Sequence, residues 1–145
     1  MRYFTDDKNY EFWIFGDDLV YTNYFDECEI DELIIHELMD KLFAANSKQS
    51  YYSMVSFKNI YGKFSQEAKE IVGNHPDLVK TKKAEVLLSN SLAVRLLIKG
   101  YLLITRPSVP TFTCETEKEG LEWLISKGVS QDSVSEFLEW RKSNS

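Results

Sequence analysis

Cysteine and long apolar runs are both scarce in this sequence. Only two cysteines, Cys28 and Cys114, occur among the 145 residues. Small secreted domains that depend on several disulfides are therefore excluded. The longest apolar run, residues 92–104, is too short to span a bilayer and is interrupted by two basic residues and a glycine. The first residues also lack the charged-then-apolar layout of a signal peptide. We therefore expect a cytoplasmic protein with no membrane insertion.

The motifs of common enzyme classes are missing as well. The glycines are scattered, and nothing resembles the glycine-rich loop that binds phosphates. Neither His36 nor His75 is near a recognisable nucleophile, and neither cysteine has basic neighbours that would lower its thiol pKa. His36 shares a helical face with Glu32 and Asp40, a trio that can bind a divalent metal but is common on solvated helices. We expect no enzymatic activity, no cofactor and no metal.

The balance of charge is acidic and uneven. Hydrophobic residues make up 43% of the chain and charged residues 28%, which is typical of a globular protein, here one domain over residues 1–145. The net charge is −6, and residues 1–50 hold 12 acidic but only 4 basic residues. Because phosphate binding needs a basic face, we expect no nucleic-acid partner. The acidic surface either steers a basic protein partner or keeps the chain soluble.

Alternating strand and helix signals predict an α/β fold. Two β-rich runs, residues 10–15 and 19–25, flank a Gly-Asp-Asp turn and indicate an antiparallel hairpin. Helices then alternate with short strands, so we predict a mixed sheet of about five strands in which the hairpin is followed by parallel strands. The further elements are a helix at 30–45, a strand at 51–57, a helix at 66–72, a turn at 75–77, a strand at 84–88, a helix at 92–104, a strand at 111–114, a helix at 117–126 and an extra C-terminal helix at about 130–142.

Two segments carry expectations about burial. The helix at 92–104 is apolar almost all round, with Arg95 and Lys99 as a narrow polar stripe, so we expect it to be buried on most sides. The lysines at 80, 82 and 83, just before the strand at 84–88, are typical of a solvated loop.

The segment from residue 84 to residue 124 has the most distinctive motifs. It contains AEVLLSNSLAVRLL, the P-x-x-P of Pro107 and Pro110, the strand TFTC and the ending KEGLEWL; upstream, SQEAKEIVG follows the strand SMVSF. With these motifs the chain, from residue 10 to residue 124, resembles the STAS-like family of bacterial proteins, which are related to anti-sigma-factor antagonists and to the cytoplasmic domain of sulfate transporters. The resemblance implies a STAS-like sheet and a non-enzymatic interaction module, sometimes switched by phosphorylation or by a ligand.

Ser65 is the candidate for such a phosphorylation switch. Phosphorylated members of that family carry an Asp-Ser pair just after the third strand, and residues 57–65 contain no such pair. Ser65 opens a predicted helix, where free N–H groups would stabilise a phosphate. The same position also suits an ordinary helix N-cap.

The start of the helix at 92–104 is the candidate ligand site. Ser89, Asn90 and Ser91 offer polar side chains at the helix N-terminus, and Arg95 lies one turn inside. Helix N-termini and guanidinium groups bind anions. Ligands of parallel sheets collect beyond the carboxyl ends of the strands, which here include Lys58-Asn59. The alternative is that these residues only cap the helix.

The aromatic residues of the hairpin predict a contact surface. One face of the strand at 10–15 carries Trp13 and Phe15, and the opposite face is apolar as well. Something must cover both faces. We expect a homodimer or another protein partner that contacts Trp13 and Phe15, or the last helix around Phe137 and Trp140.

Two functions are compatible with these patterns. The leading expectation is a non-enzymatic STAS-like regulatory or protein-interaction domain. The alternative is a carrier or sensor of a small ligand, a lipid or an anion. An apolar helix packed on a sheet could line a pocket for a lipid, with Leu96, Tyr101 and Leu103 in its wall.

Overall fold

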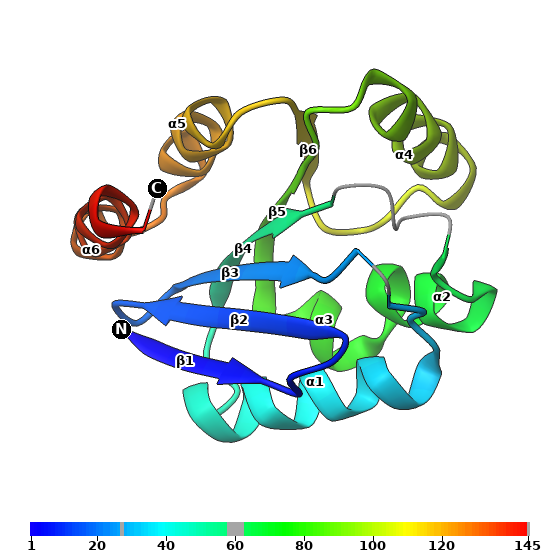
Figure 1. Cartoon of the computed structure of the whole chain (residues 1–145), viewed down its shortest axis with the longest axis horizontal. Helices are drawn as coiled ribbons and strands as arrows, with labels where there is room; N and C mark the ends of the chain where they lie inside the picture. Colours follow the sequence, from blue (N-terminus) through cyan, green and yellow to red (C-terminus); the bar gives the residue numbers. More distant parts are fainter. Residues whose placement is uncertain (27, 58–62, 145) are drawn as a thin grey trace.

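A six-stranded mixed sheet forms the centre of the molecule. The computed structural model describes residues 1–26, 28–57 and 63–144. The strands lie side by side in chain order; β1, β2 and β3 are antiparallel, and β3 to β6 are parallel (Figure 1). This confirms the predicted α/β class, with a hairpin followed by parallel strands. The strands are β1 (Arg2–Thr5), β2 (Tyr10–Phe15), β3 (Leu19–Tyr24), β4 (Tyr51–Ser56), β5 (Lys82–Leu88) and β6 (Thr111–Cys114).

The helices cover both faces of this sheet. Each parallel strand lies next to the one before it in the chain, so right-handed connections between these strands place all of their helices on the same face of the sheet. The helices that follow the last strand can then cover the other face. Accordingly, α1 to α4 contribute to one hydrophobic core, and α5 and α6 pack in a second core on the opposite face (Figure 1). The helices are α1 (Glu32–Asn46), α2 (Gln66–Asn74), α3 (Pro76–Thr81), α4 (Leu92–Thr105), α5 (Glu117–Lys127) and α6 (Gln131–Ser143).

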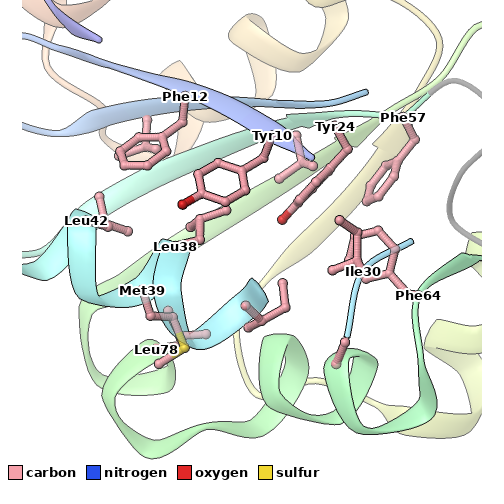
Figure 2. Packing of buried hydrophobic residues seen from close by; sticks show 14 of the residues in the cluster. Tyr10, Phe12, Tyr24, Ile30, Leu38, Met39, Leu42, Phe57, Phe64 and Leu78 are labelled. Carbon is pink, nitrogen blue, oxygen red and sulfur yellow. The ribbon is translucent and has the colours of Figure 1, made fainter. Parts of the chain in front are cut away.

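The core under α1 is rich in aromatic rings. Tyr10 and Phe12 of β2 are fully buried there and face Leu38 and Leu42 of α1 (Figure 2). The helical period explains the pairing, because residues four apart share one face of α1. These contacts cover the first face of the hairpin.

The second face of the hairpin is covered by α6, within the same chain. Phe15 and Phe137 are almost completely buried, and their rings lie 5.2 Å apart. The half-buried rings of Trp13 and Trp140 lie 4.8 Å apart. We expected these four residues to form a surface for a partner. For Phe15 and Phe137 this expectation is wrong, because the two rings are buried against each other within the chain.

The β2–β3 turn is fastened to the start of α6. Gly16 has a φ of +54°, and a Cβ at this position would lie 2.2 Å from Ser133 Oγ. The carboxylate of Asp18 accepts hydrogen bonds from the backbone N–H (3.0 Å) and hydroxyl (2.9 Å) of Ser130 and from the hydroxyl of Ser133 (2.5 Å). Turn and helix therefore form one packed unit.

Three local predictions need correction. β1 was not expected; it pairs with β2 along its whole length. The predicted turn at 75–77 is the beginning of α3, with Pro76 in the first turn, where its missing N–H does no harm. The three lysines expected in a solvated loop lie instead in α3 (Lys80) and at the start of β5 (Lys82 and Lys83). Lys80 and Lys83 are exposed, but Lys82 is only 6% exposed because its ammonium group pairs with Glu85 inside the molecule.

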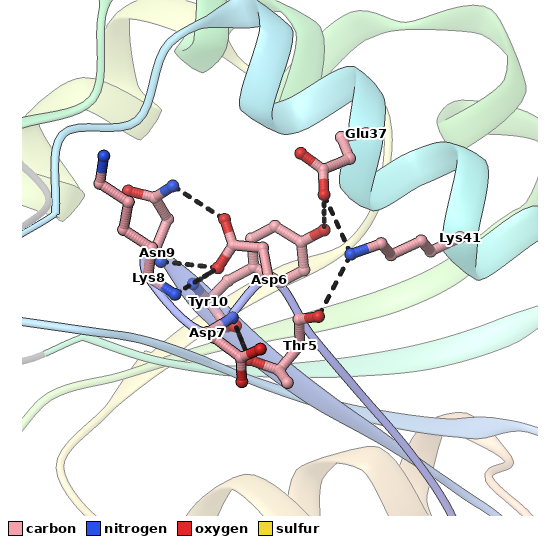
Figure 3. Close-up of polar contacts among 8 residues, drawn as sticks. All are labelled: Thr5, Asp6, Asp7, Lys8, Asn9, Tyr10, Glu37 and Lys41. Atoms are coloured by element: carbon pink, nitrogen blue, oxygen red, sulfur yellow. Dashed lines mark hydrogen bonds and ion pairs between the residues drawn. The ribbon is translucent and has the colours of Figure 1, made fainter.

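Asp6 closes the turn between β1 and β2. Its carboxylate accepts hydrogen bonds from the backbone N–H groups of Lys8 (3.0 Å), Asn9 (2.6 Å) and Tyr10 (3.0 Å) (Figure 3). Burial raises the pKa of Asp6, but these hydrogen bonds outweigh it and lower the pKa below its ordinary value. Nearby, Lys41 of α1 donates to the carbonyl of Thr5, which ties the helix to this end of the sheet (Figure 3).

We expect Asp6→Ala to destabilise the chain by about 1–3 kcal/mol at pH 7, because three backbone donors lose a charged acceptor. The folded pKa is depressed, so this contribution is present above the unfolded pKa of about 3.9 and disappears as the pH falls through the folded value. Urea titrations of both proteins at several pH values measure it. A difference that stays constant down to pH 2 would contradict this role of the carboxylate.

Candidate functional site

Helix α4 is the most unusual feature of the surface. It was expected to be buried on most sides, but in the structure only Val94 and Ile98 are buried. Five large apolar side chains of the helix are exposed, with exposed fractions that range from 50% at Leu97 to 83% at Ile104. We call the solvent-facing side of this helix the α4 surface. It consists of Leu92, Ala93, Leu96, Leu97, Gly100, Leu103 and Ile104.

The α4 surface is continuous. At about 100° per residue its members follow one another around the side of the helix opposite Val94 and Ile98. Arg95 and Lys99 lie at one border and interrupt nothing. Soluble proteins rarely leave a contiguous apolar patch of this kind exposed, and such patches mark interaction sites. The position of α4 beside the edge strand β6 explains the exposure, because in the described part of the chain no further strand or helix lies beyond β6 (Figure 1).

Gly100 lies in the middle of the α4 surface. A Cβ at this position would meet nothing within 4 Å, so no intramolecular contact requires a glycine. Glycine within a helix costs about 0.5–1 kcal/mol relative to alanine. The effect of Gly100 is to leave the helix backbone open to close approach from outside.

The segment of sequence that contains α4 is basic although the chain is acidic. No Asp or Glu lies between Glu85 and Glu115, whereas Arg95, Lys99 and Arg106 do. The whole chain has 23 acidic and 17 basic residues. The charge of this region is therefore opposite in sign to the net charge of the molecule.

The structure brings the predicted anion-binding residues together at the start of α4, where most of their groups are already used. Ser89 Oγ accepts from the Ser91 N–H (3.1 Å), Ser91 Oγ accepts from the Val94 N–H (3.3 Å), and Arg95 donates to the carbonyl of Ser89 (2.8 Å). Asn90 is exposed beside them. These contacts match the capping alternative, and anion binding stays a prediction. Lys58-Asn59, also named for this edge, lies outside the described residues.

The other polar candidates also have local partners. Ser65 is the N-cap of α2 and its Oγ accepts from the Ala68 N–H at 3.0 Å; its phosphorylation stays a prediction. His36 faces His75, with ring centroids 6.1 Å apart, beside a groove that Asp40 also lines. Within residues 1–26, 28–57 and 63–144, no three His, Cys, Asp or Glu side chains are grouped so as to hold a metal ion.

Cys28 and Cys114 are both buried. Burial raises the pKa of the Cys114 thiol to about 11, and the negative charge of Glu119 adds to this effect. Burial likewise raises the pKa of Cys28. Both side chains are therefore protonated at neutral pH, a state that suits packing and not nucleophilic attack.

The pocket expected beneath α4 exists in a different form. Tyr101 and Leu102 of α4 line a cavity of about 50 Å³ between α2, α4 and β5. Leu96 is exposed, and Leu103 lines a shallow groove beside β6. The exposed leucines and the cavity are thus separate features on opposite sides of one helix.

Comparison with known proteins gives one match. No curated protein and no solved structure is significantly similar to the chain. In the described part of the chain, no helix has the length and apolar character needed to cross a membrane. Residues 12–127 match the model of a family described as a domain of unknown function, DUF7793; the match spans β2 to α5 and leaves out β1 and α6. Since it covers most of the 145 residues, the chain belongs to the DUF7793 family.

Proposed function

We propose that this chain is a protein-interaction domain without catalytic activity, and that the α4 surface docks an acidic amphipathic helix of a partner protein. The observation that carries the proposal is the continuous apolar face of α4, which gathers five exposed large apolar side chains on one helix, whereas most other apolar side chains lie in two cores. The proposal includes a relation to the STAS-like family. An N-terminal hairpin followed by parallel strands, together with the motifs of residues 84–124, supports that relation.

The shape of the α4 surface suits a helix. Leucine side chains one turn apart form ridges into which an opposing helix can insert its own apolar residues. Gly100, at the middle, lets the two backbones approach closely. A partner helix would thus cover the exposed leucines and pack against Gly100, the position of the α4 surface that has no side chain.

The charge of α4 favours an acidic partner over a second copy of this chain. Arg95 and Lys99 border the α4 surface, and α4 itself carries no acidic residue. Two α4 helices packed face to face would bring these cations close to their own copies, which is unfavourable. A helix with acidic residues along its apolar stripe would pair with them instead.

The test uses variants of surface leucines, which are expected to fold normally because the side chains are exposed. The tagged protein is captured from its own cells as wild type, as Leu96→Ser/Leu103→Ser and as Leu33→Ser. Leu33 is 74% exposed on α1 and serves as the matched control. We expect one stoichiometric protein with wild type and Leu33→Ser, and binding more than about tenfold weaker with the double variant.

The partner must also have the proposed chemistry. A synthetic peptide of its acidic amphipathic helix should compete with it, and the competition should weaken as salt is raised. The proposal fails if no captured protein depends on Leu96 and Leu103. It also fails if sedimentation shows that those leucines serve only self-association.

We expect Gly100→Ala to act in opposite directions on stability and on binding. The free chain should gain about 0.5–1 kcal/mol, because alanine is the better helix former and its Cβ meets nothing. Binding of the partner helix should weaken, because the added methyl group blocks the close approach. Thermal unfolding and titration of the peptide measure the two effects. Stabilisation without loss of binding would show that no helix packs across Gly100.

A further inference from the structure

The sheet ends at β6, and the outer edge of this strand is open. In the described part of the chain, β6 pairs with β5 alone (Figure 1). Proteins often shield such an edge with charged residues or prolines in the strand. The opposite edge strand, β1, carries Arg2, whereas the sequence of β6, TFTC, contains neither a charge nor a proline. The edge of β6 can therefore pair with a further strand.

The hydrogen bonds to β5 show which main-chain groups of β6 face outward. The carbonyl of Pro110 accepts from the N–H of Glu85 at 2.9 Å, so Pro110 and every second residue after it direct their main-chain groups toward β5. Thr111 and Thr113, which alternate with them, direct theirs to the open edge. Two N–H and two C=O groups are thus available to a seventh strand.

A groove lies beside this edge on the face that α4 covers. Lys99, Leu102 and Leu103 of α4 form one wall, and Thr111 and Thr113 of β6 contribute to the other. The Oγ1 atom of Thr113 is buried and has no hydrogen-bond partner among the described residues. Because buried polar atoms are nearly always paired, this hydroxyl favours a ligand that brings an acceptor to the groove.

The wall that α4 contributes is basic. Of the described residues that line the groove, only Lys99 is charged, and no described acidic side chain forms an ion pair with it. Arg95 lies one turn earlier on the same flank of α4, since residues four apart share a face of a helix. The charge of the groove therefore favours an acidic ligand.

We propose that the outer edge of β6 binds an extended acidic segment of a partner protein as a seventh strand. Its main chain would pair with Thr111 and Thr113. Acidic side chains at every second position would lie in the groove beside Lys99, where one of them can accept from the Thr113 hydroxyl. The side chains between them would lie on the opposite face beside Phe112, whose ring stacks on that of Trp123 at 5.4 Å and favours apolar neighbours.

A second copy of this chain suits the same edge poorly. Two β6 strands paired antiparallel around a two-fold axis would bring both α4 helices to the same face of the joined sheet, flank to flank. Arg95 and Lys99 would then approach their own copies, which is unfavourable. A partner strand with acidic side chains would instead pair with these cations.

The probe is a synthetic seven-residue peptide that alternates glutamate and valine, titrated into the whole chain while amide chemical shifts are followed. We expect saturable shifts at residues 99–103 and 111–114, and at least about tenfold weaker binding of a peptide with lysine in place of glutamate. Two further versions are N-methylated on all glutamates or on all valines. One should lose binding and the other should keep it, because only alternate N–H groups of a strand face its neighbour.

Variants of the chain test the same contacts from the other side. Thr113→Pro removes one outward N–H and should weaken peptide binding by more than about tenfold; the matched control Thr113→Val keeps that N–H and should weaken binding by only about threefold. Lys99→Glu should reverse the preference, so that the lysine peptide binds better. Leu96→Ser changes the α4 surface away from the groove and should leave peptide binding unaltered, so this proposal and the docking of a helix can fail separately.

Four results would overturn the proposal. They are the absence of saturable shifts with the glutamate peptide, equal binding of the two N-methylated versions, an unchanged preference after Lys99→Glu, and a dimer in sedimentation whose β6 edge excludes the peptide. Far-UV circular dichroism shows whether each variant is folded. If Thr113→Pro does not fold, Lys99→Glu and the N-methylated peptides still decide the question.

Discussion

Replacing Glu85 by leucine is expected to destabilise the protein by about 3–5 kcal/mol, because the change leaves the ammonium group of Lys82 buried without its partner. Lys82 is 6% exposed and two cavities beside it are lined mainly by apolar side chains, so water can solvate the orphaned charge only poorly. The whole stability of a domain is about 5–15 kcal/mol, so the loss is large. Urea denaturation at pH 7 measures it directly.

The double variant Lys82→Met/Glu85→Leu should recover that loss. Replacing both ions by apolar side chains of similar volume is typically neutral or stabilising by about 1–4 kcal/mol. Together with Lys82→Met alone, the wild type, both single variants and the double variant form a cycle that gives the coupling between the two positions. A loss of less than about 1 kcal/mol with Glu85→Leu alone would mean that water hydrates the ion pair in solution. That result would contradict the burial of Lys82 and Glu85.

Phe137→Ala is expected to be equally severe, with a loss of about 3–5 kcal/mol. Phe137 is 1% exposed, and its ring packs on Phe15 and Tyr21 at the face of the hairpin that α6 covers. Truncation removes the transfer free energy of the ring and leaves a cavity that the strand cannot fill. Leu138→Ala is the matched control. The side chain of Leu138, next to Phe137 in the sequence, is 46% exposed, so its truncation should destabilise the protein far less.

This variant separates two interpretations of the same aromatic residue. If Phe137 belonged to a surface between copies, Phe137→Ala would change the oligomeric state and leave the unfolding of the monomer nearly unaffected. If it belongs to the core, unfolding shifts and the mass in solution does not. Denaturation combined with light scattering on both variants distinguishes the two.

Local signals in the sequence predicted the secondary structure well, because they act over a few residues. Ser65, Ser91, Thr116 and Ser130 are N-caps as their position before apolar runs indicates, and Gly128 ends α5 with a φ of +110°. Turn residues and strand periodicity likewise predicted the hairpin. Such features need no knowledge of what packs against them.

Burial was harder to predict, because it depends on neighbours that are remote in the sequence. The apolar character of α4 could not reveal that the sheet ends at β6 and leaves half of the helix uncovered. The run of lysines could not reveal the bulge in the pairing of β4 with β5 that turns Lys82 inward. Phe15 and Phe137 are 122 positions apart, and only the folded chain shows that each is the partner of the other.

The attachment of α6 to the β2–β3 turn has a consequence for the order of folding during synthesis. The hairpin leaves the ribosome early, but the Ser130 and Ser133 hydroxyls that hold Asp18, and the rings that cover Phe15, are made more than 100 residues later. Contacts of such sequence separation form slowly, because a long loop must close first. The aromatic face of the β2–β3 hairpin that carries Phe15 therefore stays uncovered until α6 has been synthesised. During that interval the nascent chain is most exposed to chaperones and to aggregation.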